Sequence, residues 1–261
     1  MSNHIHILSP HFDDAVFSLS HLLLNFKGTI TLITVFTQEC EFKHLKGDYS
    51  KYGNLKQRKY EDACAMEQIV KQNRNLKLIP RYFDLPDAMF RSFWENPVND
   101  IKNKLACEQI NHIYCPLGIG NHPDHVACYK ACGELFPSYK ITYYSEYPYN
   151  SLKLNMVSFS CGINLRLTWN DIFSYYNHAM YASCPRIVRI YRIITSLFYY
   201  FIPYKQRKIA TILEKAVNLT LKKKLMLCYS SQIEPIFGIC NKNKLDIDSK
   251  EYLYTLSDAS S

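Results

Sequence analysis

The strongest constraint on the fold is an alternation of strand and helix patterns through the first half of the chain. Short β-branched and apolar segments alternate with segments whose apolar residues recur at helical spacing. The predicted strands are His4–Ser9, Thr29–Phe36, Leu76–Phe83, His112–Pro116 and Ile141–Tyr144. The predicted helices are Ala15–Phe26, Gln57–Lys71, Val98–Glu108 and Pro123–Leu135. This order predicts an α/β fold with a Rossmann-like, mostly parallel sheet and helices on both faces.

The second half of the chain is less regular. We expect a strand within Val157–Leu165 and helices over Trp169–Ala182 and Lys205–Ser230. No linker or internal repeat divides the chain, so we expect a single domain over residues 1–261. Its core should run from about residue 4 to about residue 235, followed by a tail from about residue 246 to residue 261 that is polar at its end and expected to be mobile.

The charge balance is basic, because 31 Lys and Arg residues against 23 Asp and Glu residues give a formal net charge of +8. Such a balance can indicate nucleic acid, an anionic membrane or a phosphorylated substrate. The basic residues are spread along the chain, and no RNA-binding signature surrounds the densest run, residues 222–224. A solvated basic surface is the simpler interpretation, and we expect no nucleic-acid partner.

Cysteine usage and the N-terminal sequence favour a cytoplasmic protein. The ten cysteines include no CxxC pair, and no basic segment followed by a long apolar stretch opens the sequence. We therefore expect no signal peptide, and free thiols in a reducing compartment.

The most apolar stretch is Ile187–Pro203, which contains Arg189 and Arg192. It is short for a membrane-spanning helix, so we expect a buried helix with a basic end. The alternative is peripheral membrane contact, in which the flanking cations meet lipid headgroups.

The first chemical motif lies in Ser9–Asp14, between the first predicted strand and the first predicted helix. In open α/β sheets, ligands bind at the carboxyl ends of the strands. A histidine and two adjacent carboxylates are costly to desolvate there without a partner, and a cation is such a partner. His11 and Asp14 are three residues apart and can face one point, which leaves Asp13 free to act as a base. The alternative is that Asp13 and Asp14 only cap the helix.

The second motif is His122–His125, which follows the fourth predicted strand and also opens a helix. Two imidazoles and a carboxylate within four residues form a dense set of metal-ligating groups. Pro123 suits the first helical position, and the preceding Gly118 and Gly120 let the backbone approach a substrate closely. The alternative is a capped helix with surface histidines.

The two motifs support each other because both lie at strand-to-helix turns on the same edge of the predicted sheet. Two histidines and one carboxylate around an open fourth position are typical of a hydrolytic zinc site. The remaining acid and histidine would supply a base and an electrophilic partner.

These residues resemble the motifs of the PIG-L/LmbE-like deacetylase family. The family's first motif, His-Pro-Asp-Asp-Glu, stands here as His11–Ala15, and its second motif, His-x-x-His with an Asp before the last His, stands as His122–His125. The resemblance runs from about residue 4 to about residue 235. Weaker similarities lie in Arg58–Glu61, Leu85–Ala88, Tyr144–Tyr149 and Tyr229–Gln232.

The resemblance implies an LmbE-like fold and a reaction that removes an N-acetyl group from an amino-sugar conjugate, which a nucleotide or a lipid could carry. It implies Zn²⁺ as cofactor, with three ligands: His11, Asp14 and His125. Asp13 would be the general base that takes a proton from the zinc-bound water. His122 would stabilise the oxyanion, Asp124 would orient His122, and Arg58 would contact the substrate.

Two positions depart from the family pattern: Phe12 replaces the usual Pro and Ala15 replaces the usual Glu. Neither position is a metal ligand in that pattern, so the implied chemistry is retained. Phe12 could reshape the pocket wall, and Ala15 removes an acid that could support the ligands. Both changes therefore bear on the substrate more than on the reaction.

Two other classes of protein share some of these sequence features. A glycosyltransferase-like nucleotide-sugar enzyme would hold Mg²⁺ or Mn²⁺ through carboxylates and phosphate oxygens. No GxGxxG motif or P-loop follows the first strand, and two ligand histidines favour zinc over magnesium. A catalytically inactive, sugar-binding relative would be indicated by loss of Asp13 or His125, and both are present.

Overall fold

A computed structural model describes residues 3–40, 54–88, 90–91, 95–118, 122–135, 140–148, 155–159, 162–166, 209–237, 247 and 249–256. These residues form a seven-stranded sheet of order β3-β2-β1-β4-β5-β9-β8 and a separate pair, β6-β7. The strands are β1 His4–Ser9, β2 Gly28–Thr34, β3 Leu76–Tyr82, β4 His112–Pro116, β5 Lys140–Tyr144, β6 Asn155–Phe159, β7 Gly162–Arg166, β8 Ile209–Ala216 and β9 Lys250–Leu256. The helices are α1 Asp14–Ser18, α2 Ser20–Asn25, α3 Leu55–Gln72, α4 Val98–Ala106, α5 Pro123–Leu135, α9 Leu219–Met226 and α10 Ser230–Phe237.

The predicted α/β fold with a mostly parallel sheet is confirmed. Strands β3, β2, β1, β4 and β5 run parallel to one another, whereas β9 and β8 extend the sheet in antiparallel pairs. The strand order reverses between β1 and β4, because β1 continues to β2 on one side and pairs with β4 on the other. Ligands of open α/β sheets bind outside the carboxyl ends of the strands at such a point.

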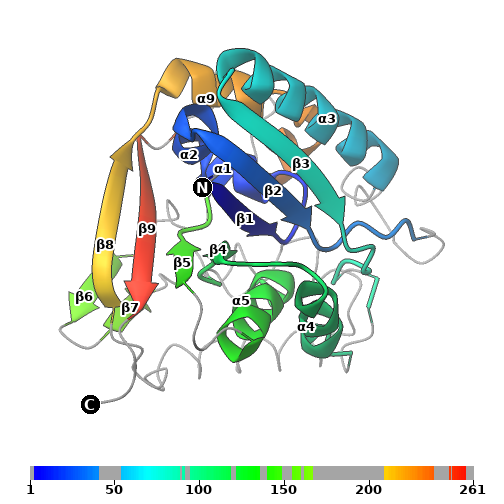
Figure 1. Cartoon of the computed structure of the whole chain (residues 1–261), viewed down its shortest axis with the longest axis vertical. Helices are drawn as coiled ribbons and strands as arrows, with labels where there is room; N and C mark the ends of the chain where they lie inside the picture. The colour runs from blue at the N-terminus through cyan, green and yellow to red at the C-terminus, as the bar shows by residue number, and fades with distance from the viewer. Residues whose placement is uncertain are drawn as a thin grey trace.

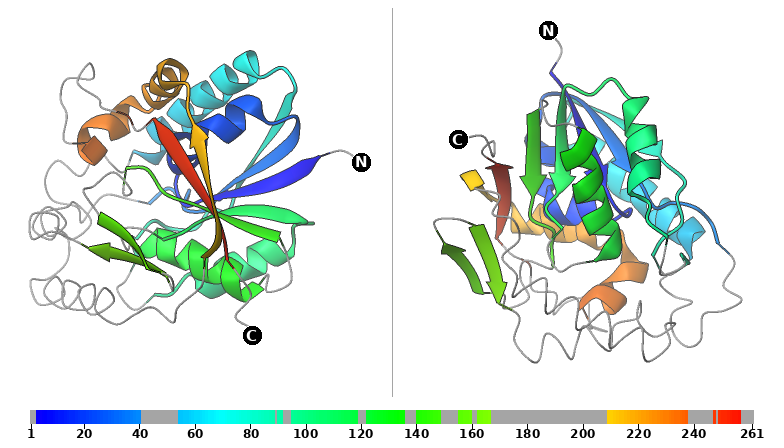
Figure 2. Two further views of the ribbon diagram at one scale, coloured as in Figure 1. Left: turned by 90° about the vertical axis from the view of Figure 1, so that its left-hand side faces the viewer. Right: turned by 90° about the horizontal axis from the view of Figure 1, so that it is seen from below.

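Helices cover both faces of the sheet (Figures 1 and 2). On one face, α1, α2, α3 and α9 pack over Ile5 and Ile7 of β1, and on the other face α4 and α5 pack over Leu8 and Ile113. These side chains are at most 3% exposed. Each buried side chain of this size contributes about 1.5–3 kcal/mol to folding, so the parallel strands form a stable base for the loops that leave their ends.

The single helix predicted for Ala15–Phe26 is two short helices that meet at Leu19. The carboxylate of Glu251, from β9, accepts hydrogen bonds from the backbone N–H groups of Ser20 at 3.0 Å and His21 at 2.9 Å. It therefore satisfies two donors at the start of α2, which would otherwise lack partners. The Lys222 ammonium lies 3.0 Å from this carboxylate and offsets its buried charge.

Two predictions for the C-terminal part of the chain are wrong. The helix predicted over Lys205–Ser230 is replaced at residues 209–216 by strand β8, and a helix begins only at Leu219. The tail that was expected to be mobile contains β9, whose Leu253 and Tyr254 are 8% and 1% exposed. These adjacent residues point to opposite faces of the sheet and belong to the two different core clusters, so β9 is buried on both faces at this point.

The strand expected within Val157–Leu165 is the antiparallel pair β6 and β7. The expected helix over Trp169–Ala182 and the apolar stretch Ile187–Pro203 lie outside the described residues. Among the described helices, none combines the length and the apolar character needed to span a membrane.

Candidate metal centre

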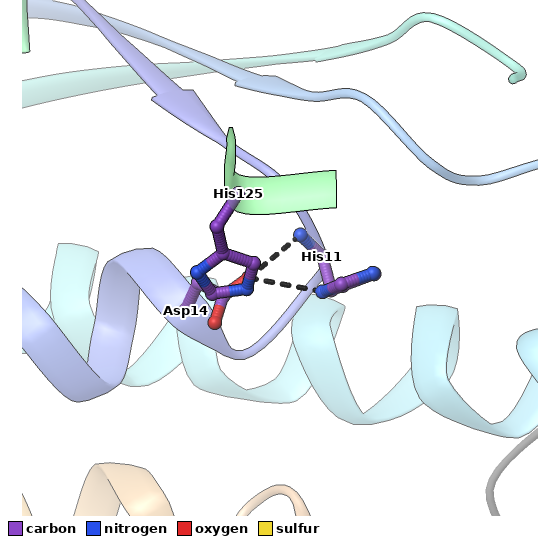
Figure 3. Close-up of side chains that lie close together, drawn as sticks. All are labelled: His11, Asp14 and His125. Carbon is purple, nitrogen blue, oxygen red and sulfur yellow. Dashed lines mark hydrogen bonds and ion pairs between the residues drawn. The ribbon is translucent and has the colours of Figure 1, made fainter. Parts of the chain in front are cut away.

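Both sequence motifs meet at the carboxyl ends of β1 and β4. β1 ends at Ser9 and α1 begins at Asp14, while β4 ends at Pro116 and α5 begins at Pro123. Figure 3 shows His11 and Asp14 converging with His125 of α5. The expectation that the two motifs share one edge of the sheet is thus confirmed.

A local hydrogen-bond network sets the conformation of the first motif. The Ser9 hydroxyl donates to the carbonyl of His11 at 2.6 Å and accepts from the N–H of Ala15 at 3.1 Å. The N–H of His11 donates to Oδ2 of Asp14 at 2.9 Å. The turn therefore directs the His11 ring back toward the carboxylate at the start of α1.

Three ligand atoms lie close enough to bind one ion. Nδ1 of His11 is 3.2 Å from Oδ2 of Asp14, and Nε2 of His125 is 3.3 Å from the same oxygen. The three ligand atoms lie within 4.8 Å of one another, and all three side chains are buried. A second possible group, His11 with His122 and Asp124, shares His11 with the first.

The charge of the site also fits a divalent cation. Buried carboxylates outnumber the guanidinium groups of Arg58 and Arg91; they are Asp13, Asp14, Asp87, Asp124 and Glu146. A cation among them would offset charge that is otherwise costly to bury. Two imidazoles and a carboxylate are a donor set that Zn²⁺ prefers, so the residues present fit zinc.

The histidine and carboxylate of the first motif hold each other in charged form. Burial alone would lower the pKa of His11, but the carboxylates of Asp87, Asp124 and Asp14 raise this pKa well above its usual value. Burial would raise the pKa of Asp14, but His125 and His11 hold it well below its usual value. Asp14 is thus ionised, the state in which a carboxylate binds metal.

Asp13 has a different partner. Nη2 of Arg58 donates to Oδ1 of Asp13 at 3.1 Å, and Nη1 of Arg58 lies 3.9 Å from Asp87. Burial raises the pKa of Asp13, although the charge of Arg58 opposes this. A carboxylate with a raised pKa is a stronger base than a solvated one, which suits proton transfer near neutral pH. Arg58 itself is only 5% exposed.

His122 lies beside the candidate metal ligands as a neutral imidazole. Its ring centroid is 5.1 Å from that of His11 and 4.9 Å from that of His125. Burial and the neighbouring His125 lower the pKa of His122 to about 3. The N–H of Asp124 donates to Nδ1 of His122 at 3.3 Å, which leaves the ring proton on Nε2. His122 can therefore donate a hydrogen bond from Nε2 to an oxyanion.

The carboxylate of Asp124 contacts a candidate metal ligand, His11, directly. Its Oδ2 is 3.0 Å from Nε2 of His11 and accepts from the N–H of Ala88 at 3.0 Å, while Oδ1 pairs with Arg91. The contact between Asp124 and His122 described above uses the backbone of Asp124. Asp124 is therefore placed to orient His11, a relationship that the sequence analysis did not anticipate.

The two departures from the family motif lie in the hydrophobic core. Phe12 is 2% exposed, and its ring centroid is 5.8 Å from that of Tyr82. Ala15 is fully buried in the core cluster that includes α1 and α3. Both residues fill space in the core, and the three candidate ligands converge with them in place.

Three residues of the site were not assigned a role from the sequence: Asp87, Arg91 and Glu146. Asp87 follows β3, and its Oδ2 is 3.3 Å from Nε2 of His11. Glu146 follows β5, and its Oε1 is 3.2 Å from Nδ1 of His125. The rule that ligands bind at the carboxyl ends of strands could have found both acids, because each follows a predicted strand. Arg91 carries no comparable sequence signal.

Comparisons with known proteins are consistent with this geometry. A family model, PIG-L, described as GlcNAc-PI de-N-acetylase, matches residues 6–136, which include both motifs. No curated protein sequence matches the chain.

Solved structures of similar fold include two deacetylases. The A40926 pseudoaglycone deacetylase Dbv21 is 17% identical, with a TM-score of 0.64 and 98% of each chain covered. The zinc-inhibited form of teicoplanin deacetylase Orf2 is 15% identical, with a TM-score of 0.62 over 99% of this chain and 100% of that chain. A conserved protein from Thermus thermophilus is 13% identical, with a TM-score of 0.51 over 98% of this chain and 94% of that chain. These similarities show a shared fold, and because the family model spans half of the chain, the chain belongs to the PIG-L family of de-N-acetylases.

Proposed function

We propose that this protein is a zinc-dependent hydrolase that removes an N-acetyl group from an amino-sugar conjugate. The observation that carries the proposal is the meeting of Nδ1 of His11 and Nε2 of His125 at one oxygen of Asp14, at 3.2 and 3.3 Å. These three residues would hold the Zn²⁺ ion. Membership of a de-N-acetylase family and the names of two similar structures as deacetylases support the reaction class.

The remaining residues of the site have the chemistry that amide hydrolysis needs. A bound Zn²⁺ would supply Lewis-acid activation of water and of the amide carbonyl. Asp13 takes a proton from the attacking water, and the water oxygen bonds to the carbonyl carbon. Because Arg58 holds Oδ1 of Asp13, we assign the proton to the other oxygen of that carboxylate.

The tetrahedral species carries negative charge on the former carbonyl oxygen. His122 donates its Nε2–H to this oxyanion, in keeping with its neutral ring. Because the pKa of His122 is about 3, its ring is neutral near pH 7 and holds no second ring proton that it could give to the departing amine. Asp13 therefore returns its proton to the departing nitrogen, the C–N bond breaks, and acetate and a free amine are released.

The other two classes of function have less support. The buried imidazoles of His11 and His125 favour zinc over the magnesium of a nucleotide-sugar enzyme. Asp13 is intact and paired with Arg58, which favours an active enzyme over a sugar-binding relative. We also propose a single domain over residues 1–261, a cytoplasmic location, and a small-molecule conjugate as the partner in place of nucleic acid.

The experiment that tests the function compares the zinc content of the purified protein with that of His11→Ala. We expect about one zinc per wild-type chain, its loss in the variant, and release of acetate from N-acetylglucosamine conjugates by the wild type alone. Wild-type protein that takes up no zinc during reconstitution at neutral pH would contradict the proposal. The control variant is Arg74→Ala, at an exposed position, which should purify, fold and bind zinc as the wild type does.

A further inference from the structure

Glu146 is a fully buried carboxylate that contacts two residues directly after β4 and a histidine in the first turn of α5. Its Oε1 accepts from the N–H of Gly118 at 2.7 Å, and the same oxygen lies 3.2 Å from Nδ1 of His125. Its Oε2 accepts from the N–H of Leu117 at 3.2 Å, which also donates to the carbonyl of Tyr144. One side chain that follows β5 therefore joins the residues directly after β4 to His125 in the first turn of α5.

The contact with His125 determines which ring nitrogen can bind a metal. A neutral imidazole carries one N–H, and the nitrogen without it offers the lone pair that a metal needs. A carboxylate at Nδ1 accepts the N–H there, so the lone pair lies on Nε2. Nε2 of His125 is the atom that lies 3.3 Å from Oδ2 of Asp14. The His125 side chain is 1% exposed, so bulk water does not compete for Nδ1.

The contacts with Leu117 and Gly118 hold the backbone directly after β4. Gly118 has a φ of +80°, a backbone conformation that residues other than glycine rarely adopt. Its N–H donates to Glu146. A buried carboxylate is costly unless N–H groups or cations stabilise it, and the two loop N–H groups do so here. The Glu146 carboxylate thus interacts both with the backbone N–H groups after β4 and with the ring of His125.

We propose that Glu146 is a positioning residue of the metal centre, which holds His125 with Nε2 toward the ion and thereby sets zinc affinity. The proposal rests on the proposed function, in that it requires zinc at His11, Asp14 and His125. Carboxylates and other groups that accept the second ring N–H of a ligating histidine raise metal affinity by about 10- to 100-fold. We expect the loss of zinc affinity on removal of the Glu146 carboxylate to lie in this range, because this carboxylate also holds the backbone at Leu117 and Gly118.

The test compares Glu146→Gln with Glu251→Gln, a matched control. Glu251 is also a buried carboxylate, 4% exposed, that accepts two backbone N–H groups, but its partners are Ser20, His21 and Lys222. The dissociation constant for zinc is measured by competition with a chelator, and thermal unfolding is followed for the zinc-free proteins. We expect zinc binding about 10- to 100-fold weaker in Glu146→Gln and unchanged in Glu251→Gln, with both variants less stable.

Wild-type zinc affinity in Glu146→Gln would overturn the inference, and so would an equal loss of affinity in both variants. A second measurement uses the wild type, and so does not depend on folding of the variant. In zinc-loaded, ¹⁵N-histidine-labelled protein, we expect a proton on Nδ1 of His125 and the metal on Nε2, with the signals identified by their absence in His125→Gln. Metal on Nδ1 would overturn the inference. Wild-type protein that binds no zinc would overturn the proposed function as well, whereas zinc binding insensitive to Glu146 overturns this inference alone.

Discussion

Asp124 and His11 are 113 residues apart in sequence, yet Oδ2 of Asp124 lies 3.0 Å from Nε2 of His11. Because Asp124 contacts Nε2 of His11, the other ring nitrogen, Nδ1, faces Asp14. In the same way, Glu146 contacts Nδ1 of His125, and Nε2 of that ring faces Asp14. Each proposed histidine ligand is therefore oriented by a carboxylate from another segment of the chain. The arrangement matches the general use of carboxylates to fix the tautomer of ligating histidines.

The first prediction concerns this pair. Asp124→Asn keeps the shape of the side chain but removes the charge that stabilises the Nε2–H of His11. We expect zinc affinity to fall by about 10- to 100-fold, measured by chelator competition. The control is Asp100→Asn, at an exposed position in the first turn of α4. Equal affinity in the wild type and Asp124→Asn would show that the contact does not contribute to metal binding.

The second prediction tests Asp13 as the general base. Asp13 pairs with Arg58 and lies outside both groups of candidate ligands, so Asp13→Asn should retain zinc. Removal of a general base typically lowers the rate by about 10²- to 10⁴-fold. Metal content and acetate release are measured on the same preparation. Near-normal turnover with zinc bound would assign the base elsewhere.

The third prediction separates two roles for Arg58. If Arg58 mainly holds Asp13 in place, Arg58→Gln should lower kcat with little change in KM, because an interaction with the base acts in the chemical step. If Arg58 mainly binds substrate in the ground state, KM should rise instead. We expect the effect on kcat, because Arg58 is 5% exposed and its Nη2 already donates to Asp13. Arg74→Gln, at an exposed position after α3, is the control.

Much of the α/β half of the chain was predictable from the sequence. The mostly apolar run that becomes β2 is buried on both faces from Ile30 to Thr34, and this produces a pattern that can be read locally. Both metal motifs were located for the same reason, because each occupies the turn between a recognisable strand and a recognisable helix. Their meeting follows from strand pairing once the sheet is parallel.

The remaining features depend on contacts between distant segments, which leave little trace in local sequence. The break at Leu19 arises where Glu251, more than 200 residues away, accepts the N–H groups of α2. β8 contains residues common in helices, and its pairing with β9 determines its conformation. Asp87 and Arg91 reach His11 and Asp124 through a loop whose sequence has no regular pattern.

The last prediction concerns stability and pH, and it involves a carboxyl group that lies away from the ligands. Asp62 on α3 is 0% exposed and accepts a hydrogen bond from the hydroxyl of Tyr229 at 2.7 Å. Burial raises the pKa of Asp62 from 3.8 to about 7. At pH values between these two pKa values, the Asp62 carboxyl holds a proton in the folded protein and has released it in the unfolded chain. Stability from this group should therefore fall as pH rises through that window, and be lowest above pH 7.

Asp62→Asn removes the ionisation and keeps an oxygen that can accept from Tyr229. Relative to the wild type, the variant should gain stability as pH rises from about 4 to about 8, by an amount on the order of a few kcal/mol. The free energy of unfolding is measured by denaturant titration of the zinc-free protein, because zinc binding has its own pH dependence. Asp100→Asn, with its exposed carboxyl, should follow the wild-type curve. A constant difference between Asp62→Asn and the wild type across this range would mean that the carboxyl of Asp62 ionises with an ordinary pKa, and that its burial is compensated in the folded protein.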